Sequence, residues 1–192
     1  MNQGFIYPLN FRCVARLYAL LAIEHKENHS NAILLTSPRP FARLIFNAAM
    51  ELKTITTNTP EYEAMIALRT KVLLDPIGIP RSYINPEKER SDVLIGAYEE
   101  DNLIGCCILT AVDENTLQLR QMAVDTVLQQ KGIGAAILAF AENIAKERGY
   151  KMLMMHARDA VIGFYQKCGY QICGEQFFEV GIGHHKMQKQ LS

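Results

Sequence analysis

The stretch Gln-Gln-Lys-Gly-Ile-Gly at residues 129–134 constrains the fold of this chain more than any other part of it. Its two glycines, one residue apart, let the backbone turn tightly and leave N–H groups facing outward. The positions that follow have the spacing of an amphipathic helix, with apolar residues at Ile133, Ile137, Phe140 and Ile144. Because free N–H groups and the positive end of the helix dipole both attract anions, the sequence predicts a phosphate- or pyrophosphate-binding loop at the start of a helix.

Two common phosphate motifs do not fit this loop. A P-loop requires Gly-x4-Gly-Lys-Ser/Thr, and the sequence contains no such run. A dinucleotide-binding loop requires a third glycine three residues after the second, where this chain has Ile137. Two interpretations stay open at this point: a different kind of phosphate loop, and an ordinary turn between a strand and a helix.

The segments around the loop indicate alternating strands and helices. Residues 119–124 form a short apolar-rich run before the loop, and residues 152–155 form another after the predicted helix. Asp159 can cap a further short helix that contains Phe164 and Tyr165. The loop therefore lies at a strand-to-helix junction.

The rest of the pattern predicts a single α/β (or α+β) domain. Polar turns join the three predicted strands 93–98, 103–111 and 117–124 into an antiparallel meander. The strand–helix–strand unit that follows adds a parallel partner. Together these segments predict a mixed, strongly twisted sheet with helices on both faces.

Taken in this order, the motifs resemble the GNAT superfamily of acetyl-CoA-dependent N-acetyltransferases, in particular its small bacterial members. In that superfamily Gln-x-x-Gly-x-Gly holds the pyrophosphate of coenzyme A. Residues 156–170 resemble its second signature, and residues 174–187 resemble its C-terminal strands. A weaker resemblance reaches back to Met50. The resemblance implies the GNAT fold over residues 50–192, with a central sheet of about six to seven strands.

The resemblance also implies that acetyl-CoA is the co-substrate. It would bind at the loop and along the strand before it, where a backbone N–H would polarise the thioester carbonyl. Arg158 stands where many relatives have asparagine, and it either reaches a phosphate or a pantetheine carbonyl or is a solvated loop arginine. The expected cofactor-binding residues are Met122, Ala123, Val124, Gln129, Gln130, Lys131, Gly132, Ile133, Gly134, Ala135 and Arg158.

Three residues are candidates for the chemical step. Tyr165 occupies the superfamily's position for the acid that protonates the leaving thiolate. A phenol, with a pKa of about 10, can donate to a thiolate, whose thiol has a pKa of about 8.5, without ionising first. His156 at the end of a strand and His184 in the C-terminal turn are candidate bases for the amine, beside the water chain that the superfamily often uses.

The function expected from the resemblance is transfer of an acetyl group from acetyl-CoA to a primary amine by direct attack on the thioester. The acceptor would be a small-molecule amine or a polypeptide amine. A non-catalytic acyl-CoA-binding module and a generic phosphate-binding protein are the alternatives. Residues 75–91 and the helix before them would form the wall of the acceptor site. Arg69, on the apolar side of that helix, either extends along the surface to solvent or points into the acceptor cleft.

Composition excludes several other classes of protein. The 192 residues have a net charge of +0, so we expect neither a general nucleic-acid binder nor a membrane-surface binder. The five cysteines contain no Cys-x-x-Cys pair, and no metal-ligand spacing links them to the five histidines, so no metal is expected. Buried, reduced thiols favour a cytoplasmic location. The resemblance leaves the oligomeric state open, with a homodimer as one candidate.

Residues 1–49 carry none of these motifs and hold five basic residues against two acidic ones. Their apolar run 13–23 is too short to span a bilayer and has no small-residue cleavage site after it. We therefore expect an N-terminal extension that is poorly ordered or not native, with Met50 as the natural start. The intact mass of the protein expressed from its native locus tests this hypothesis, and a mass that includes residues 1–49 would contradict it.

Overall fold

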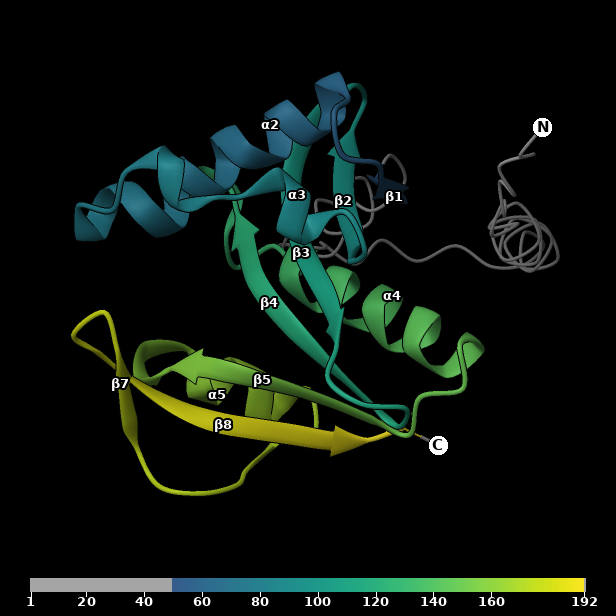
Figure 1. Ribbon diagram of the computed structural model, residues 1–192, viewed down its shortest axis with the longest axis vertical. Helices are drawn as coiled ribbons and strands as arrows, with labels where there is room; N and C mark the ends of the chain where they lie inside the picture. Colours follow the sequence, from purple (N-terminus) through teal and green to yellow (C-terminus); the bar gives the residue numbers. More distant parts are fainter. Residues whose placement is uncertain (1–49, 192) are drawn as a thin grey trace, which may run out of the picture. The chain divides into compact units, whose positions relative to one another are not determined.

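The computed structural model describes residues 50–191 of the chain. They form a mixed eight-stranded sheet with helices on both faces (Figure 1). This arrangement confirms the α/β fold class expected from the sequence. The extension expected at residues 1–49 lies outside the described residues.

The sheet begins as an antiparallel meander and then adds a parallel strand. The meander consists of β1 (Met50–Ile55), β2 (Val93–Glu99), β3 (Asn102–Ala111) and β4 (Thr116–Val124). The next two strands in the sheet are β5 (Met152–Arg158), parallel to β4, and β8 (Ile182–Gln190), antiparallel to β5. The short strands β6 (Gln171–Ile172) and β7 (Phe177–Glu179) both pair with β8, and they bring the count above the six to seven expected.

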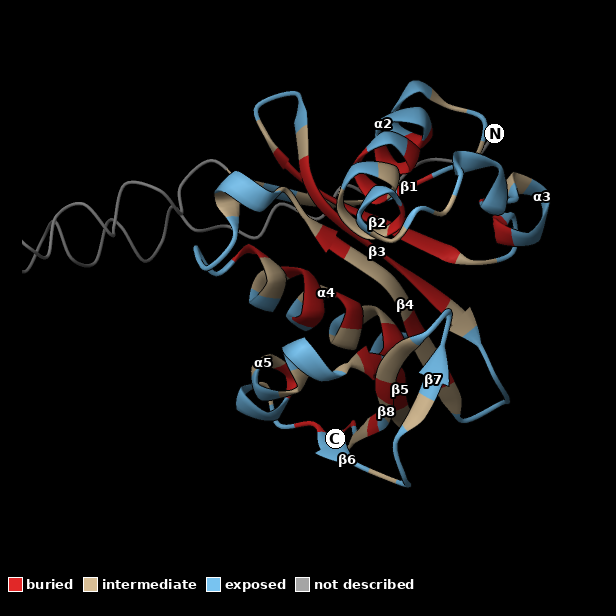
Figure 2. Ribbon diagram, turned by 90° about the vertical axis from the view of Figure 1, so that its left-hand side faces the viewer, coloured by how far each residue is buried: buried red, intermediate tan, exposed pale blue. Residues whose placement is uncertain are grey.

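Helices cover both faces of the sheet (Figure 2). One face carries α2 (Pro60–Arg69) and α3 (Pro86–Glu89), and the other carries α4 (Ile133–Glu147) and α5 (Ile162–Lys167). The start of α2 follows the predicted pattern, because the Thr59 hydroxyl accepts a hydrogen bond from the Tyr62 N–H at 3.2 Å. The shorter helical turns are η2 (Thr70–Leu74), η3 (Asp75–Ile77), η4 (Arg81–Tyr83), η5 (Thr126–Leu128) and η6 (Asp159–Val161).

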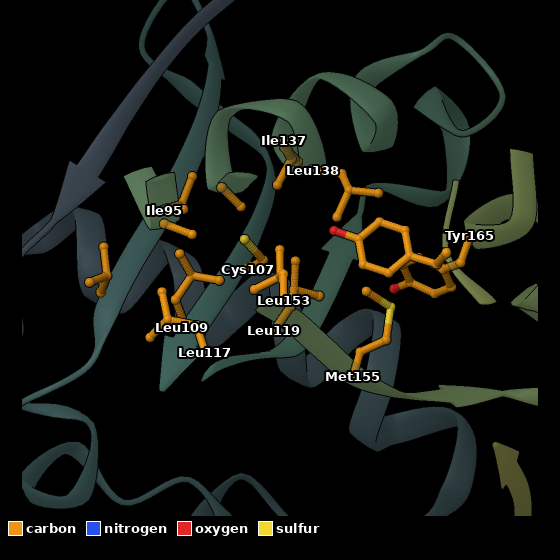
Figure 3. Close-up of a cluster of buried hydrophobic side chains, with 14 of the residues drawn as sticks. Ile95, Cys107, Leu109, Leu117, Leu119, Ile137, Leu138, Leu153, Met155 and Tyr165 are labelled. Carbon is orange, nitrogen blue, oxygen red and sulfur yellow. The ribbon is translucent and has the colours of Figure 1, made fainter. Parts of the chain in front are cut away.

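The core has one apolar cluster on each face of the sheet. The neighbouring residues Cys106 and Cys107 separate into the two clusters, because successive side chains of a strand point to opposite faces. Both thiols are fully buried and free. The cluster on the α4 face also contains Tyr165, which lies near Leu138 and Met155 (Figure 3). The two clusters fix both helical layers against the sheet.

The centre of the sheet opens between β4 and β5. The two strands pair only over Thr116–Leu119 of β4 and then diverge toward their C-terminal ends (Figure 1). A bulge in the β3–β4 pairing falls at the same place, and Gln121 there has a φ of 48°. A bulge bends its strand and re-aims the side chains around it. The edge of β4 that faces β5 is therefore unpaired from Arg120 onward.

The turn η2 holds the diverging strand ends at a fixed separation. On one side, the Lys71 ammonium lies 3.0 Å from Asp125 Oδ2, just after β4. On the other side, the Arg158 guanidinium at the end of β5 donates to the Leu73 carbonyl at 3.2 Å. Both links start from one helical turn, so they bridge the opening. Among residues 50–191, no helix is long and apolar enough to cross a membrane.

Candidate active site

The loop before α4 is built as an anion site. Gln130 and Gly132 both have positive φ, at 65° and 88°, so successive N–H groups turn toward one side. No side chain caps the first turn of α4. The first N–H groups of a helix have no partner inside it, so those at Ile133 and Gly134 remain available to a ligand. These features fit a pyrophosphate.

Replacing Gly132 with alanine should weaken the binding of coenzyme A at the loop without blocking the loop sterically. A Cβ at Gly132 would meet no heavy atom within 4 Å, so the cost is the left-handed backbone alone, about 1–2 kcal/mol. We expect the dissociation constant of coenzyme A, measured by calorimetry, to rise about tenfold. Gly149 is the matched control, because it has a φ of 85° and an equally open surrounding at the other end of α4. Equal weakening by Gly149→Ala would contradict a local role for the loop.

The residues around the loop fix its place against β4. The Gln129 amide donates to the Val124 carbonyl at 3.2 Å and thereby holds the loop to the strand end. A Cβ at Gly134 would lie 3.1 Å from Met122 Cε and 3.3 Å from Phe164 Cζ. A side chain at this position would therefore crowd Met122 and Phe164 where α4, β4 and α5 meet. Of the remaining predicted loop residues, Ile133 is buried in the core, whereas Gln130, Lys131 and Ala135 are exposed.

The unpaired edge of β4 lies directly beside this loop. Ala123 and Val124 pair with β3 on one side, Met122 lies in the bulge beside them, and none of the three has a β5 partner within residues 50–191. An extended ligand with amide groups can pair with such an edge as an added strand. The chain thus has features that fit two parts of coenzyme A, the pyrophosphate at α4 and the pantetheine arm along β4.

Tyr165 reaches this edge of β4 from α5. Its hydroxyl lies 3.6 Å from Met122 Sδ, and only 7% of the residue is exposed. Burial raises the pKa of Tyr165 well above its usual value, and the nearby Cys107 and Cys168 thiols act in the same direction. The phenol is therefore protonated at neutral pH, as a proton donor must be.

The two candidate histidines lie together on the other side of the opening. His156 on β5 makes a 2.7 Å contact from Nδ1 to Glu179 Oε1 on β7, and its ring packs edge-on against Phe177. His184 on β8 places Nδ1 2.8 Å from the Ile182 carbonyl and stacks on the same Phe177 ring. Carboxylate and carbonyl oxygens only accept, so each Nδ1 carries a proton, and in the neutral ring Nε2 holds the lone pair. The His184 Nε2 lies 4.0 Å from Glu179 Oε2. When neutral, either ring can accept a proton at Nε2.

A pocket of about 480 Å³ lies between β4 and β5 where the strands diverge. Its walls come from four regions of the chain, and include Tyr83, Gln118, Arg120, Gln121, His156 and Glu179. His184 is not among the lining residues and is only 7% exposed. The pocket therefore favours His156 over His184. It also contains Glu179 and Gln121, of which Gln121 could not be foreseen from the sequence as a site residue.

Arg69 does not extend to solvent, and the expectation of a surface arginine is wrong. It is 0% exposed and forms a two-pronged ion pair with Glu89, with contacts of 2.6 and 2.8 Å. Its Nε donates to Gln121 Oε1 at 2.7 Å, so the arginine contacts a pocket residue rather than the pocket itself. Tyr62 completes the group by donating to Glu89 at 2.8 Å. This cluster was missed because Glu89 lies in a segment with no clear periodicity.

Arg158 lies apart from the pyrophosphate loop in this structure. It follows His156 by two residues on β5 and points to the α2 face, where it bonds the Leu73 carbonyl. Its role in holding the cofactor stays a prediction. No group of three or more His, Cys, Asp or Glu residues within 50–191 is placed to hold a metal ion.

Comparisons with known proteins agree with this geometry. Residues 61–170 match the Acetyltransferase (GNAT) family. An uncharacterized protein of Bacillus subtilis (strain 168), YyaT, is 30% identical over 149 residues, which cover 74% of this chain and 97% of YyaT.

Two solved structures share the fold. One is a putative N-acetyltransferase from Lactobacillus plantarum, with a TM-score of 0.67, 24% identity, and coverage of 75% of this chain and 99% of that one. The other is a GNAT family acetyltransferase from Elizabethkingia anophelis with acetyl-CoA bound, with a TM-score of 0.59, 24% identity, and coverage of 76% and 100%. The family match, which covers more than half of the chain, confirms the expected acetyltransferase, and this chain belongs to the GNAT family of acetyltransferases.

Proposed function

We propose that this protein transfers an acetyl group from acetyl-CoA to a primary amine that attacks the thioester directly. One observation carries the proposal: an uncapped helix start, an unpaired strand edge and the Tyr165 hydroxyl meet around Met122. The loop 129–134 binds the pyrophosphate, and Met122–Val124 align the pantetheine arm through their backbone groups. Acetyl-CoA supplies the activated acetyl group.

Direct attack is favoured over transfer through a cysteine. Cys106 lies opposite Ala123 on the neighbouring strand, which makes it the thiol closest in register to the cofactor strand. Burial raises its pKa to about 12. Burial also raises the pKa of Cys107 well above the usual value. Two fully buried neutral thiols cannot serve as acyl-carrying nucleophiles.

The proposed proton transfers use the two sides of the opening. The amine arrives protonated, because an alkyl ammonium has a pKa of about 10.4, and it must lose that proton before attack. His156 accepts the proton at Nε2, directly or through water, while Glu179 stabilises the imidazolium through Nδ1. Tyr165 gives its proton to the departing thiolate.

The amine-dependent release of free coenzyme A thiol from acetyl-CoA tests the proposal. We expect release with at least one member of a panel of small primary amines and peptide α-amines, with the acetylated amine as the second product. Tight binding of acetyl-CoA without turnover on any amine would instead support the acyl-CoA-binding module. The four cysteines among residues 50–191 are free thiols, which supports a reducing compartment such as the cytoplasm.

Replacing His156 with asparagine should lower kcat/KM for the amine at pH 7 by about 100-fold, because the proton acceptor is lost. The loss should shrink as the pH approaches the pKa of the amine, where the free base is already abundant. A pH profile of kcat/KM measures both effects. His185→Asn is the control, since His185 bonds Asp159 at 2.9 Å and does not line the pocket. A loss with His156→Asn that stays constant across pH would contradict the role of His156 as a base.

A further inference from the structure

Gln121 has an unusual position in the wall of the pocket. It lies in the β4 bulge, with a φ of 48°, where a residue other than glycine is uncommon. Its side chain turns toward α2 and not along the strand, because Oε1 accepts hydrogen bonds from both Nε and Nη2 of Arg69. The backbone conformation and the side-chain contact together fix where the carboxamide lies.

The contact with Arg69 also fixes which way the carboxamide faces. A guanidinium only donates, so the amide oxygen must point at Arg69 and the amide nitrogen must point away from it. Arg69 cannot turn to release Gln121, because Glu89 accepts hydrogen bonds from Nη1 and Nη2 of Arg69 and Tyr62 in turn donates to Glu89. The orientation of a glutamine amide is usually ambiguous, but here its surroundings determine it.

Within residues 50–191, the nitrogen of this amide has no hydrogen-bond partner. No described residue accepts a hydrogen bond from Gln121 Nε2, and this nitrogen is not among the buried unbonded atoms. Gln121 lines the pocket together with Gln118 and Arg120 from the same strand. Gln121 therefore contributes an amide with two unbonded N–H donors to the wall of the pocket in which the amine would bind.

The opposite wall of the pocket has the complementary character. Glu179 and His156 offer a carboxylate and a nitrogen lone pair, both of which attract an ammonium or an amine N–H. The pocket thus has a donor side on β4 and an acceptor side on β5 and β7. A ligand that satisfies both sides carries an amine at one end and a hydrogen-bond-accepting oxygen at the other.

We propose that Gln121 is a specificity-determining residue that selects primary amines carrying a carbonyl or carboxylate oxygen near the nitrogen. Arg69 acts as a positioning residue, because it presents the Gln121 N–H donors to that oxygen. The inference rests on the proposed acetyl transfer to an amine and adds the chemical class of the acceptor. An amine of this class makes a hydrogen bond that a plain alkylamine of the same shape cannot make.

The test compares amines with the same heavy-atom skeleton. Isobutylamine, glycinamide and glycine have the same shape and differ in whether they carry no oxygen, an amide oxygen or a carboxylate. Phenethylamine and phenylalaninamide, which differ by one carboxamide group and so do not share a skeleton, extend the comparison to larger amines. The variant is Gln121→Glu, which is isosteric and keeps the contact with Arg69 but has no N–H donor. Gln118→Glu is the control, because it adds the same charge to the same pocket without touching Arg69.

We expect Gln121→Glu to lower kcat/KM for the oxygen-bearing amines by about 10- to 100-fold and to change the values for isobutylamine and phenethylamine by less than about threefold. The KM for acetyl-CoA should not change. Comparing each amine with itself cancels differences in intrinsic reactivity. If Gln121→Glu does not fold, Gln121→Met removes the donors without adding charge and should show the same selective loss.

Different negative results would overturn the role of Gln121 and the proposed acetyl transfer. An equal loss for all amines, no loss, or the same selective loss with Gln118→Glu would overturn the role of Gln121. Turnover by the unmodified protein only with amines that lack an oxygen would also overturn it. No turnover with any amine would overturn the proposed acetyl transfer itself, and the inference with it.

Discussion

Replacing Tyr165 with phenylalanine should lower kcat by about 10²–10⁴-fold, because the leaving thiolate loses its proton donor. Acetyl-CoA affinity should stay nearly the same, since the substitution removes one hydroxyl and leaves the ring in the α4-face core. Because burial raises the pKa of Tyr165, the unmodified protein should keep this donor protonated throughout the neutral and mildly alkaline range. Steady-state kinetics with acetyl-CoA and a competent amine, together with calorimetry of acetyl-CoA binding, measure both effects.

Tyr170→Phe provides the control for this substitution. Tyr170 packs against Tyr165 with ring centroids 6.1 Å apart, and its hydroxyl donates to Glu142 at 3.0 Å, so it does not face β4. Loss of this hydrogen bond should reduce stability and leave kcat unchanged. An unchanged kcat in Tyr165→Phe would remove Tyr165 from the mechanism.

Breaking the Arg69–Glu89 pair should have the largest effect on stability. Arg69→Met leaves the Glu89 carboxylate buried without its partner, which costs about 3–5 kcal/mol. For a domain of this size the melting temperature should fall by about 6–20 °C. Arg81→Ala is the control, because the Arg81–Glu63 pair is exposed on both sides and should contribute about 1 kcal/mol or less. Thermal unfolding followed by circular dichroism measures both variants.

A double replacement tests whether the loss of stability comes from leaving the buried Glu89 charge without its partner. Changing Arg69 to Met and Glu89 to Leu removes both charges and should restore part of the lost stability. If the double variant is no more stable than Arg69→Met alone, an unpaired buried charge is not the cause of the loss.

The Arg69–Glu89 pair should also make the free energy of unfolding decrease as the pH falls into the acidic range. Burial raises the pKa of Glu89, but the hydrogen bonds and charge of Arg69 outweigh it and hold the pKa below its usual value. The carboxylate therefore stabilises the fold above the pKa of an unfolded glutamate, about 4.3, and this contribution is lost as the pH falls through the lower folded value.

The features that could be predicted from the sequence are those set by nearby residues. The capped start of α2, the glycine turn before α4 and the separation of Cys106 from Cys107 each depend on a few adjacent positions and a fixed period. The cofactor half of the site follows from such local signals, because a helix start is an anion site wherever it lies.

The acceptor half depends on contacts between distant segments. Arg69 meets Glu89 across 20 positions, and His156 meets Glu179 across 23. A charge on the apolar side of a helix does not reveal whether solvent or a buried carboxylate will satisfy it. The turn of Gln121 out of the strand likewise depends on the bulge against β3, which the alternation of residues does not encode.

The opening between β4 and β5 has a consequence for how the substrates meet. The α4 loop and Tyr165 lie on one face of the sheet, whereas Arg69 and His156 lie on the other. If acetyl-CoA and the amine bind as proposed, they approach from opposite faces of the sheet and meet only at the opening between β4 and β5. Neither substrate then has to leave before the other enters. The sheet separates the thioester from nucleophiles on the α2 face, except for the amine that reaches it through the opening.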